Sequence, residues 1–194
     1  MSIKSRPVYA GFDLGKLANR NLFILKGDGA YALLEKLDKK HPMLAKIEIL
    51  HCEDGTNHTE ALNTLGVADY WLAASSQALL GRLATTLNTA TMSTRLFVAG
   101  LEDFIGDVVC LAANYGVKNE SVIKEHRGSL KRRVQCVHCK GFNQDVSHSP
   151  FRCKHCNLFL FVRDHFSARL NAFQGVCVNA EDPQVLPEPV ELFP

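Results

Sequence analysis

The stretch LFILKGDGAYALLEKL, residues 22–37, decides the fold class of the first part of this 194-residue chain. Its opening run, Leu22 to Lys26, has the length and apolar character of a buried strand. Gly27-Asp28-Gly29 then marks a turn. Apolar residues follow at the spacing of one helix face: Ala30, Leu33, Leu34 and Leu37. The segment therefore predicts a strand, a glycine turn and a helix.

The same order of elements repeats as far as about residue 116. Residues 46–51, 67–72 and 95–100 have the pattern of strands, and helical stripes lie between residues 75 and 87 and after Gly100. The stretch 52–68 carries no decisive pattern. Strands that alternate with helices form crossover connections and a parallel sheet. We therefore predict an α/β fold: a small, Rossmann-like, three-layer domain over residues 1–127.

Two C-x-x-C knuckles follow, Cys136-Val137-His138-Cys139 and Cys153-Lys154-His155-Cys156. The gap between them is long enough for a short hairpin that returns the second knuckle to the first. Four thiolates at this spacing are typical of a closed, tetrahedral metal site. We predict a zinc-ribbon or rubredoxin-like module over residues 128–163. Its single metal ion is expected to be held by Cys136, Cys139, Cys153 and Cys156.

The metal is expected to be iron or zinc, because tetrahedral sulfur coordination suits both. A cluster of two or four irons fits the spacing less well. Four thiolates leave no open position for water or substrate, so a catalytic zinc is not expected. The histidines inside the knuckles, His138 and His155, are expected to face solvent. The remaining cysteines are expected to be buried structural thiols: Cys52, Cys110 and Cys177.

The last part of the chain, residues 164–194, predicts a short helix and an extended, proline-rich docking tail. Asp164 is a suitable N-cap and Gly175 a suitable stop. Phe166, Leu170 and Phe173 have the spacing of a helix face between them. Prolines preclude a helix beyond this point and favour an extended segment that lies along another surface. These prolines are Pro183, Pro187, Pro189 and Pro194.

Composition is that of an ordinary soluble protein, with 46% hydrophobic and 22% charged residues. No apolar stretch has the length of a membrane span, and the N-terminus lacks the apolar core of a signal peptide. We therefore expect a cytoplasmic protein without membrane contact. Thiols stay reduced in the cytoplasm, which favours metal ligation by the cysteines over disulfides.

Charge is distributed unevenly although the net charge is only +2. Between Arg127 and Arg163 there are eight basic residues and one acid, Asp145, whereas the last fourteen residues carry four acids and no base. This contrast predicts docking surfaces. A nucleic-acid-binding zinc ribbon is the alternative hypothesis, with salt-sensitive binding as its signature. No aromatic ladder or RNA-binding motif supports it.

Catalytic motifs are not found. No nucleophile–base arrangement and no pair of carboxylates at a useful spacing is present, so this chain is expected to lack catalytic residues of its own. The turn Gly27-Asp28-Gly29 could open a phosphate-binding helix, but it lacks a full G-x-G-x-x-G and carries an acid. A common strand–glycine–helix turn is the favoured interpretation.

Two resemblances follow from particular segments. Residues 95–104, with the helix after them, resemble the last strand and helix of the nucleotide-binding half of ferredoxin-reductase-like flavoenzymes. That family ends the strand in Cys-Gly-Pro; here Ala99 replaces the cysteine and Leu101 the proline, and only Gly100 is kept. The turn at Gly27 looks like a degenerate form of the same family's pyrophosphate loop. The resemblance thus implies a relict domain, and no bound flavin or NAD(P) is expected in this chain.

Nearly the whole chain is similar to the DmmA-like subunit of bacterial dimethylamine monooxygenase. The segments that carry this resemblance are Ser5-Arg6-Pro7-Val8-Tyr9, the first knuckle, residues 162–167, residues 175–181 and Leu186-Pro187-Glu188-Pro189. The resemblance implies a subunit of an NADPH- and O₂-dependent complex that N-demethylates dimethylamine to methylamine and formaldehyde. It also implies two partners: a reductase subunit with flavin and a 2Fe-2S cluster, and a subunit with the oxygen-activating iron. The chain itself is expected to assemble these partners or to pass electrons between them.

Overall fold

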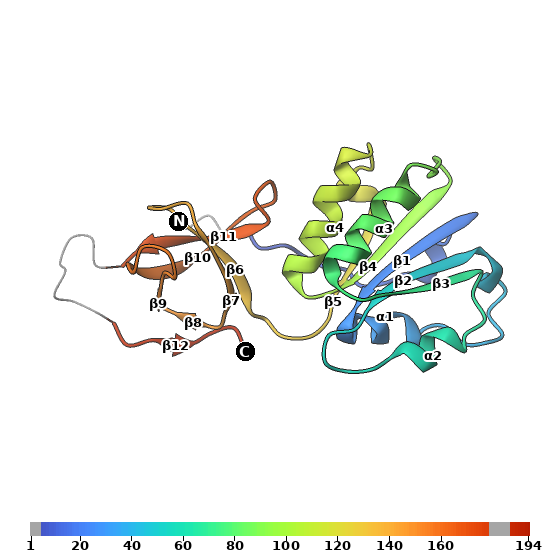
Figure 1. The fold of residues 1–194 in the computed structure, drawn as a ribbon, viewed down its shortest axis with the longest axis horizontal. Helices are drawn as coiled ribbons and strands as arrows, with labels where there is room; N and C mark the ends of the chain where they lie inside the picture. The colour runs from blue at the N-terminus through green and yellow to red at the C-terminus, as the bar shows by residue number, and fades with distance from the viewer. Residues whose placement is uncertain (1–4, 179–186) are drawn as a thin grey trace. The chain divides into compact units, whose positions relative to one another are not determined.

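The computed structural model describes residues 5–178 and 187–194 (Figure 1). The chain divides into two compact units. Tyr9–Gly128 forms the first, which we call the α/β unit. Met1–Val8 and Ser129–Pro194 together form the second, the ribbon unit. The ribbon unit therefore takes described residues from both ends of the chain, and the α/β unit is inserted between them.

The α/β unit is built on a parallel, five-stranded sheet of order β3-β2-β1-β4-β5. The strands are β1 (Arg20–Lys26), β2 (Ile47–Cys52), β3 (Asp69–Ala73), β4 (Thr94–Gly100) and β5 (Val122–His126). The longer helices are α3 (Ser76–Leu87) and α4 (Glu102–Asn114); α1 (Tyr31–Leu34) and α2 (Thr59–Asn63) are short. The unit also contains short 3₁₀ turns: η1 (Leu14–Lys16), η2 (Gly27–Ala30), η3 (Leu44–Lys46) and η4 (Asn119–Ser121). The predicted α/β class with a parallel sheet is confirmed.

Helices cover both faces of this sheet, so its central strands are apolar along nearly their whole length. Figure 1 shows α3 and α4 on one face and α1 and α2 on the other. Leu22 and Ile24 of β1 pack under α3 and α4, whereas Phe23 packs on the opposite side against Phe97 of β4. Alternate residues of one strand thus enter two separate cores, each of which is closed by its own pair of helices.

Two details of this unit differ from the sequence prediction. The helix expected over residues 30–37 is shorter than predicted: α1 spans only Tyr31–Leu34, and the 3₁₀ turn η2 over Gly27–Ala30 precedes it. β5 was not predicted, because its sequence, VIKEH, mixes charged and apolar residues at the edge of the sheet. The prediction of strands at residues 46–51 and 95–100 and of the helix at 75–87 is confirmed.

A buried histidine gives the α/β unit a specific pH dependence. His51 in β2 is fully buried, its Nδ1 lies 3.2 Å from the Tyr70 hydroxyl, and burial lowers its pKa to about 4. The unfolded chain, with a pKa near 6.5, binds the proton more readily. The contribution of neutral His51 to the free energy of unfolding is therefore fully present above pH ~6.5. It is lost, by roughly 3 kcal/mol, as the pH falls toward ~4.

This loss can be measured by urea unfolding followed by fluorescence, because Trp71 of β3 is the chain's one tryptophan and reports on this unit. His51→Gln, which keeps an acceptor for Tyr70 but cannot titrate, is expected to remove this part of the acid loss. An equal loss in the wild type and the variant would assign the acid sensitivity to other groups.

The ribbon unit contains a second five-stranded sheet, of order β7-β6-β11-β10-β9. Its strands are β6 (Arg132–Cys136), β7 (Phe142–Val146), β9 (Phe151–Arg152), β10 (Phe159–Ser167) and β11 (Ala172–Cys177). β6 and β11 are parallel and the other pairs antiparallel. A two-stranded ladder joins β8 (His148–Ser149) to β12 (Val190–Glu191) near the C-terminus.

The helix predicted between Asp164 and Gly175 is wrong. Residues 164–167 continue β10, and a turn leads into β11 at Ala172. Phe166 pairs with Phe173 across this hairpin, with ring centroids 5.1 Å apart. Asn171 makes the turn with a φ of 46°, a conformation that asparagine tolerates. A spacing of seven residues therefore brings two phenylalanines together across a hairpin as well as along a helix.

The first and the last described residues are fixed to this sheet. The Ser5 amide donates to Asp164 O, and Arg6 and Arg132 both bind the Asp164 carboxylate. At the other end, the buried Phe193 ring lies 3.9 Å from the Arg132 guanidinium, whose opposite neighbour is the Phe173 ring. Residues 187–194, which we call the C-terminal strap, thus lie over one face of the ribbon sheet. We call this the inner face; it carries Phe173 and Val134. The tail between residues 179 and 186, including Pro183, lies outside the described residues.

Within the described parts of the chain, no helix combines the length and the apolar character needed to span a membrane.

Candidate metal centre

The two C-x-x-C knuckles have the same local backbone structure. In the first, the Lys140 amide donates to Cys136 O at 3.0 Å and the Cys136 amide to Gly141 O at 2.9 Å. In the second, the Asn157 amide donates to Cys153 O at 3.0 Å and the Cys153 amide to Leu158 O at 2.9 Å.

A left-handed residue directly follows each knuckle, with a φ of 61° at Lys140 and 60° at Asn157. This conformation turns the chain sharply after the second cysteine. Both sulfurs of a knuckle therefore point to the same side of the turn.

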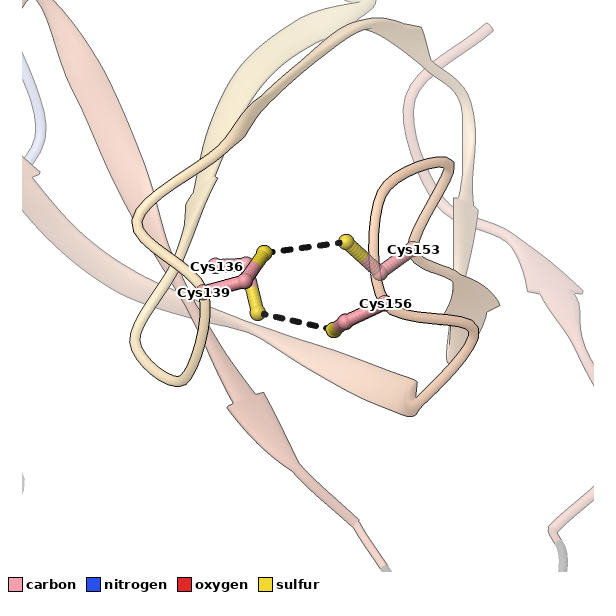
Figure 2. Close-up of side chains that lie close together, drawn as sticks. All are labelled: Cys136, Cys139, Cys153 and Cys156. Carbon is pink, nitrogen blue, oxygen red and sulfur yellow. Dashed lines mark hydrogen bonds between the residues drawn. The ribbon is translucent and has the colours of Figure 1, made fainter.

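The four sulfur atoms converge on one point between the knuckles, as Figure 2 shows. All four lie within 4.8 Å of one another. Cys136 Sγ lies 3.8 Å from Cys156 Sγ, and Cys139 Sγ lies 3.8 Å from Cys153 Sγ. A tetrahedron with metal–sulfur bonds of ~2.3 Å has edges of ~3.8 Å, whereas a disulfide would need ~2.05 Å. The thiols are free and spaced to hold a single tetrahedral ion.

Burial differs between the two sulfurs of each knuckle. The first cysteines, Cys136 and Cys153, are fully buried and pack with Leu160 in a small apolar cluster. The second ones, Cys139 and Cys156, are partly exposed. An ion at this centre would be shielded on the side of the sheet and would approach solvent on the other side.

Burial, hydrogen bonds and neighbouring sulfurs shift the pKa values of the two thiols of the second knuckle in opposite directions. Burial acts to raise the pKa of Cys153, but the amides of His155 and Cys156 and the Asn143 side chain together lower it to about 6. The pKa of Cys156 is raised to about 12: the Leu158 amide acts to lower it, but burial and the three neighbouring sulfurs outweigh that effect. Four thiolates this close together need a cation to offset their mutual repulsion.

Asn143 supports the centre from β7 and was not among the predicted site residues. It is fully buried, its Nδ2 donates to Cys153 Sγ at 3.6 Å, and its Oδ1 accepts the Lys154 amide at 2.8 Å. One side chain thus fixes the second knuckle to β7, the strand that follows the first knuckle. The register that turns Asn143 inward depends on the pairing of β6 with β7, which the sequence pattern did not reveal.

Replacement of Asn143 by alanine is expected to weaken metal binding by about 10- to 100-fold, the usual effect of losing a group that orients a metal ligand. Competition with a chromophoric chelator measures this change. Gln144→Ala is the control, because Gln144 is the exposed neighbour on the same strand. Equal affinities for the two variants would mean that Asn143 does not support the centre.

The histidines of the knuckles lie outside the sulfur cluster. The His155 Nε2 lies 2.8 Å from Phe142 O, and its ring packs so closely on Gly141 that a Cβ there would lie 2.4 Å from it. His138 is exposed. Cys52 is buried at the end of β2, and Cys110 and Cys177 are partly buried; none of these three joins the cluster.

The glycine turn after β1 lies against the end of β4. A Cβ on Gly29 would lie 2.2 Å from Ala99 O, and one on Gly100 would lie 3.2 Å from Lys26 O. These are the strand ends between which parallel α/β sheets often hold a nucleotide. Close packing of two backbones accounts for both glycines.

The fold and the site together define the class of protein: a ribbon unit whose four cysteines could hold one metal ion, with an α/β domain inserted into it. The N-terminal domain of the family described as dimethylamine monooxygenase subunit DmmA-like matches residues 1–122, and the C-terminal domain of that family matches residues 133–176. The chain belongs to this DmmA-like family, as its sequence resemblance indicated.

A relative matches over nearly the whole of both chains. The heme-dependent oxidative N-demethylase delta subunit of Ectopseudomonas mendocina (strain ymp) is 30% identical over 179 residues, which cover 92% of this chain and 91% of the relative. The similarity therefore includes both units.

Proposed function

We propose that this chain is a non-catalytic subunit of a multi-subunit, NADPH- and O₂-dependent oxidative N-demethylase that acts on dimethylamine. Membership of the DmmA-like family and the similarity to an N-demethylase delta subunit along both chains support this assignment. The name of that relative states a dependence on heme, so the proposed oxygen-activating partner carries haem iron. The second proposed partner is a reductase with flavin and a 2Fe-2S cluster.

The closed four-cysteine centre is the observation that best supports an assembly role. Cys136, Cys139, Cys153 and Cys156 would occupy every position of a tetrahedral ion, leaving none for oxygen or an amine. A structural zinc would add to the two small hydrophobic clusters that form the core of the ribbon unit. In this role the metal fixes the ribbon, and the ribbon holds the partner subunits.

Electron transfer is the second candidate, favoured by the partial exposure of Cys139 and Cys156. Iron in this site would supply one-electron redox chemistry without a change of ligands. The chain's own contribution would be to hold the ion near the surface and to exclude water from Cys136 and Cys153.

Metal analysis of the full-length protein purified without added metal distinguishes the two roles. One zinc per chain and no visible absorption are expected for the assembly role. One iron per chain, with a visible absorption band that dithionite bleaches, would contradict the assembly role and support electron transfer. Co-purification with the products of neighbouring genes tests the subunit assignment itself, and a chain that forms no complex with them contradicts it.

A further inference from the structure

The outer face of the ribbon sheet, opposite the metal centre and the C-terminal strap, has a distinctive set of residues. Successive residues of a strand point to opposite faces, and the inner positions of β10 are the buried Leu160 and Val162. Strand pairing then assigns the outer positions on β7, β6, β11, β10 and β9: Phe142, Gln135, Gln174, Val176, Phe159, Phe161, Arg163 and Arg152.

Aromatic and arginine side chains are exposed on this face. Phe161 retains 45% and Phe142 39% of their accessible surface, and Arg152 and Arg163 are exposed. The Arg152 guanidinium lies 4.4 Å from the Phe159 ring and donates to Asn157 O at 3.1 Å. This arginine is therefore held in place before any partner binds, which lowers the entropic cost of binding.

The charged residues among these eight positions are both arginines, Arg152 and Arg163. None of the eight outer residues is acidic, and no carboxylate in the described parts of the chain lies within ion-pair distance of Arg152 or Arg163. Phenylalanine and arginine are enriched at the centres of protein–protein interfaces, where aspartate, glutamate and lysine are depleted. Arginine is also among the residues that contribute most to binding energy.

We propose that this outer face docks a partner subunit of the demethylase complex through an apolar patch bordered by carboxylates. The inference rests on the proposed function. Phe161 and Phe142 would bury their rings against the patch, and Arg163 and Arg152 would form hydrogen-bonded ion pairs with the acidic border. A second copy of this chain fits less well, since arginines would then face arginines.

Paired variants of the full-length, metal-loaded chain test the proposal. Phe161→Asp and Arg163→Glu change the face. Leu130→Asp, which is similarly exposed in the segment before β6, and Arg169→Glu, in the exposed turn after β10, introduce the same charges elsewhere in the ribbon unit. The binding partners are the purified products of neighbouring genes, and dissociation constants are measured at low and high salt. Metal content and circular dichroism verify that each variant is folded.

Each face variant is expected to weaken binding at least tenfold, and each control to stay within about twofold. Binding of the wild type should also weaken with salt. Complex formation that the face variants leave unchanged overturns the docking face but leaves the subunit assignment standing. If the wild type binds none of these proteins, both proposals fail.

Two further outcomes assign the face to another occupant. Loss of self-association in the face variants would identify it as an interface between copies of the chain. Salt-sensitive binding to a single-stranded RNA or DNA oligonucleotide, lost in the same variants, would identify it as a nucleic-acid surface. Either result overturns the proposal of an acidic protein partner.

Discussion

Removal of the metal is expected to unfold the ribbon unit and to leave the α/β unit folded. The ribbon core consists of two small clusters, one around Val134 and Phe173 and one made of Leu160 with the cysteines themselves. Binding of a structural zinc supplies roughly 10–16 kcal/mol, which is comparable with the whole stability of a small domain. The α/β unit has two larger cores of its own and contains none of the four ligands.

A strong chelator and the substitution Cys153→Ser should give the same result. Amide hydrogen exchange over residues 129–178 is expected to lose its protection, while the fluorescence of Trp71 and its urea midpoint stay unchanged. Cys177→Ser in β11 is the matched control, because this partly buried cysteine lies outside the cluster. Loss of both units in one transition would show that they fold as one cooperative body. A protected ribbon in the metal-free protein would rule out a structural metal.

The metal centre could be predicted from the sequence because each knuckle is formed by contacts between neighbouring residues. The spacing of each knuckle fixes its own turn, through the amide of Lys140 or Asn157, so a pattern of four residues is enough to predict it. The central strands were also predictable, since covering both faces of the sheet makes them apolar along their length. Nothing comparable marks Asn143 or β5, whose positions depend on strand pairing that no local pattern shows.

The hairpin of β10 and β11 shows why a periodic pattern failed. Phe166 and Phe173 fit a helix face by spacing, but β11 also pairs with β6, which carries the first knuckle. The turn at Asn171 permits this pairing, and tertiary contacts override the local helical pattern. The tail gives the same lesson, since Phe193 packs against Arg132, sixty-one positions earlier in the chain.

Alanine at Gly29 is expected to destabilise the α/β unit by about 3 kcal/mol or more. The added methyl would meet three backbone atoms of β4 within 2.8 Å, the nearest being Ala99 O at 2.2 Å. Backbone in a central, buried strand cannot move aside as a flexible side chain can, so the effect lies at the upper end of the range for overpacking. Either η2 must lift from the sheet or the end of β4 must shift.

Gly81→Ala provides a control of opposite sign within the same unit. Gly81 lies on the exposed side of α3, and a Cβ there meets nothing within 4 Å. Alanine at this helical position should stabilise the unit by roughly 1 kcal/mol. Urea unfolding followed by Trp71 fluorescence compares the two variants directly. If Gly29→Ala stays within 1 kcal/mol of the wild type, the turn after β1 can separate from β4, and close packing no longer explains the glycine. A loss of about 3 kcal/mol would show that close packing requires glycine at this position, because the backbone of β4 occupies the place where a side chain would have to fit.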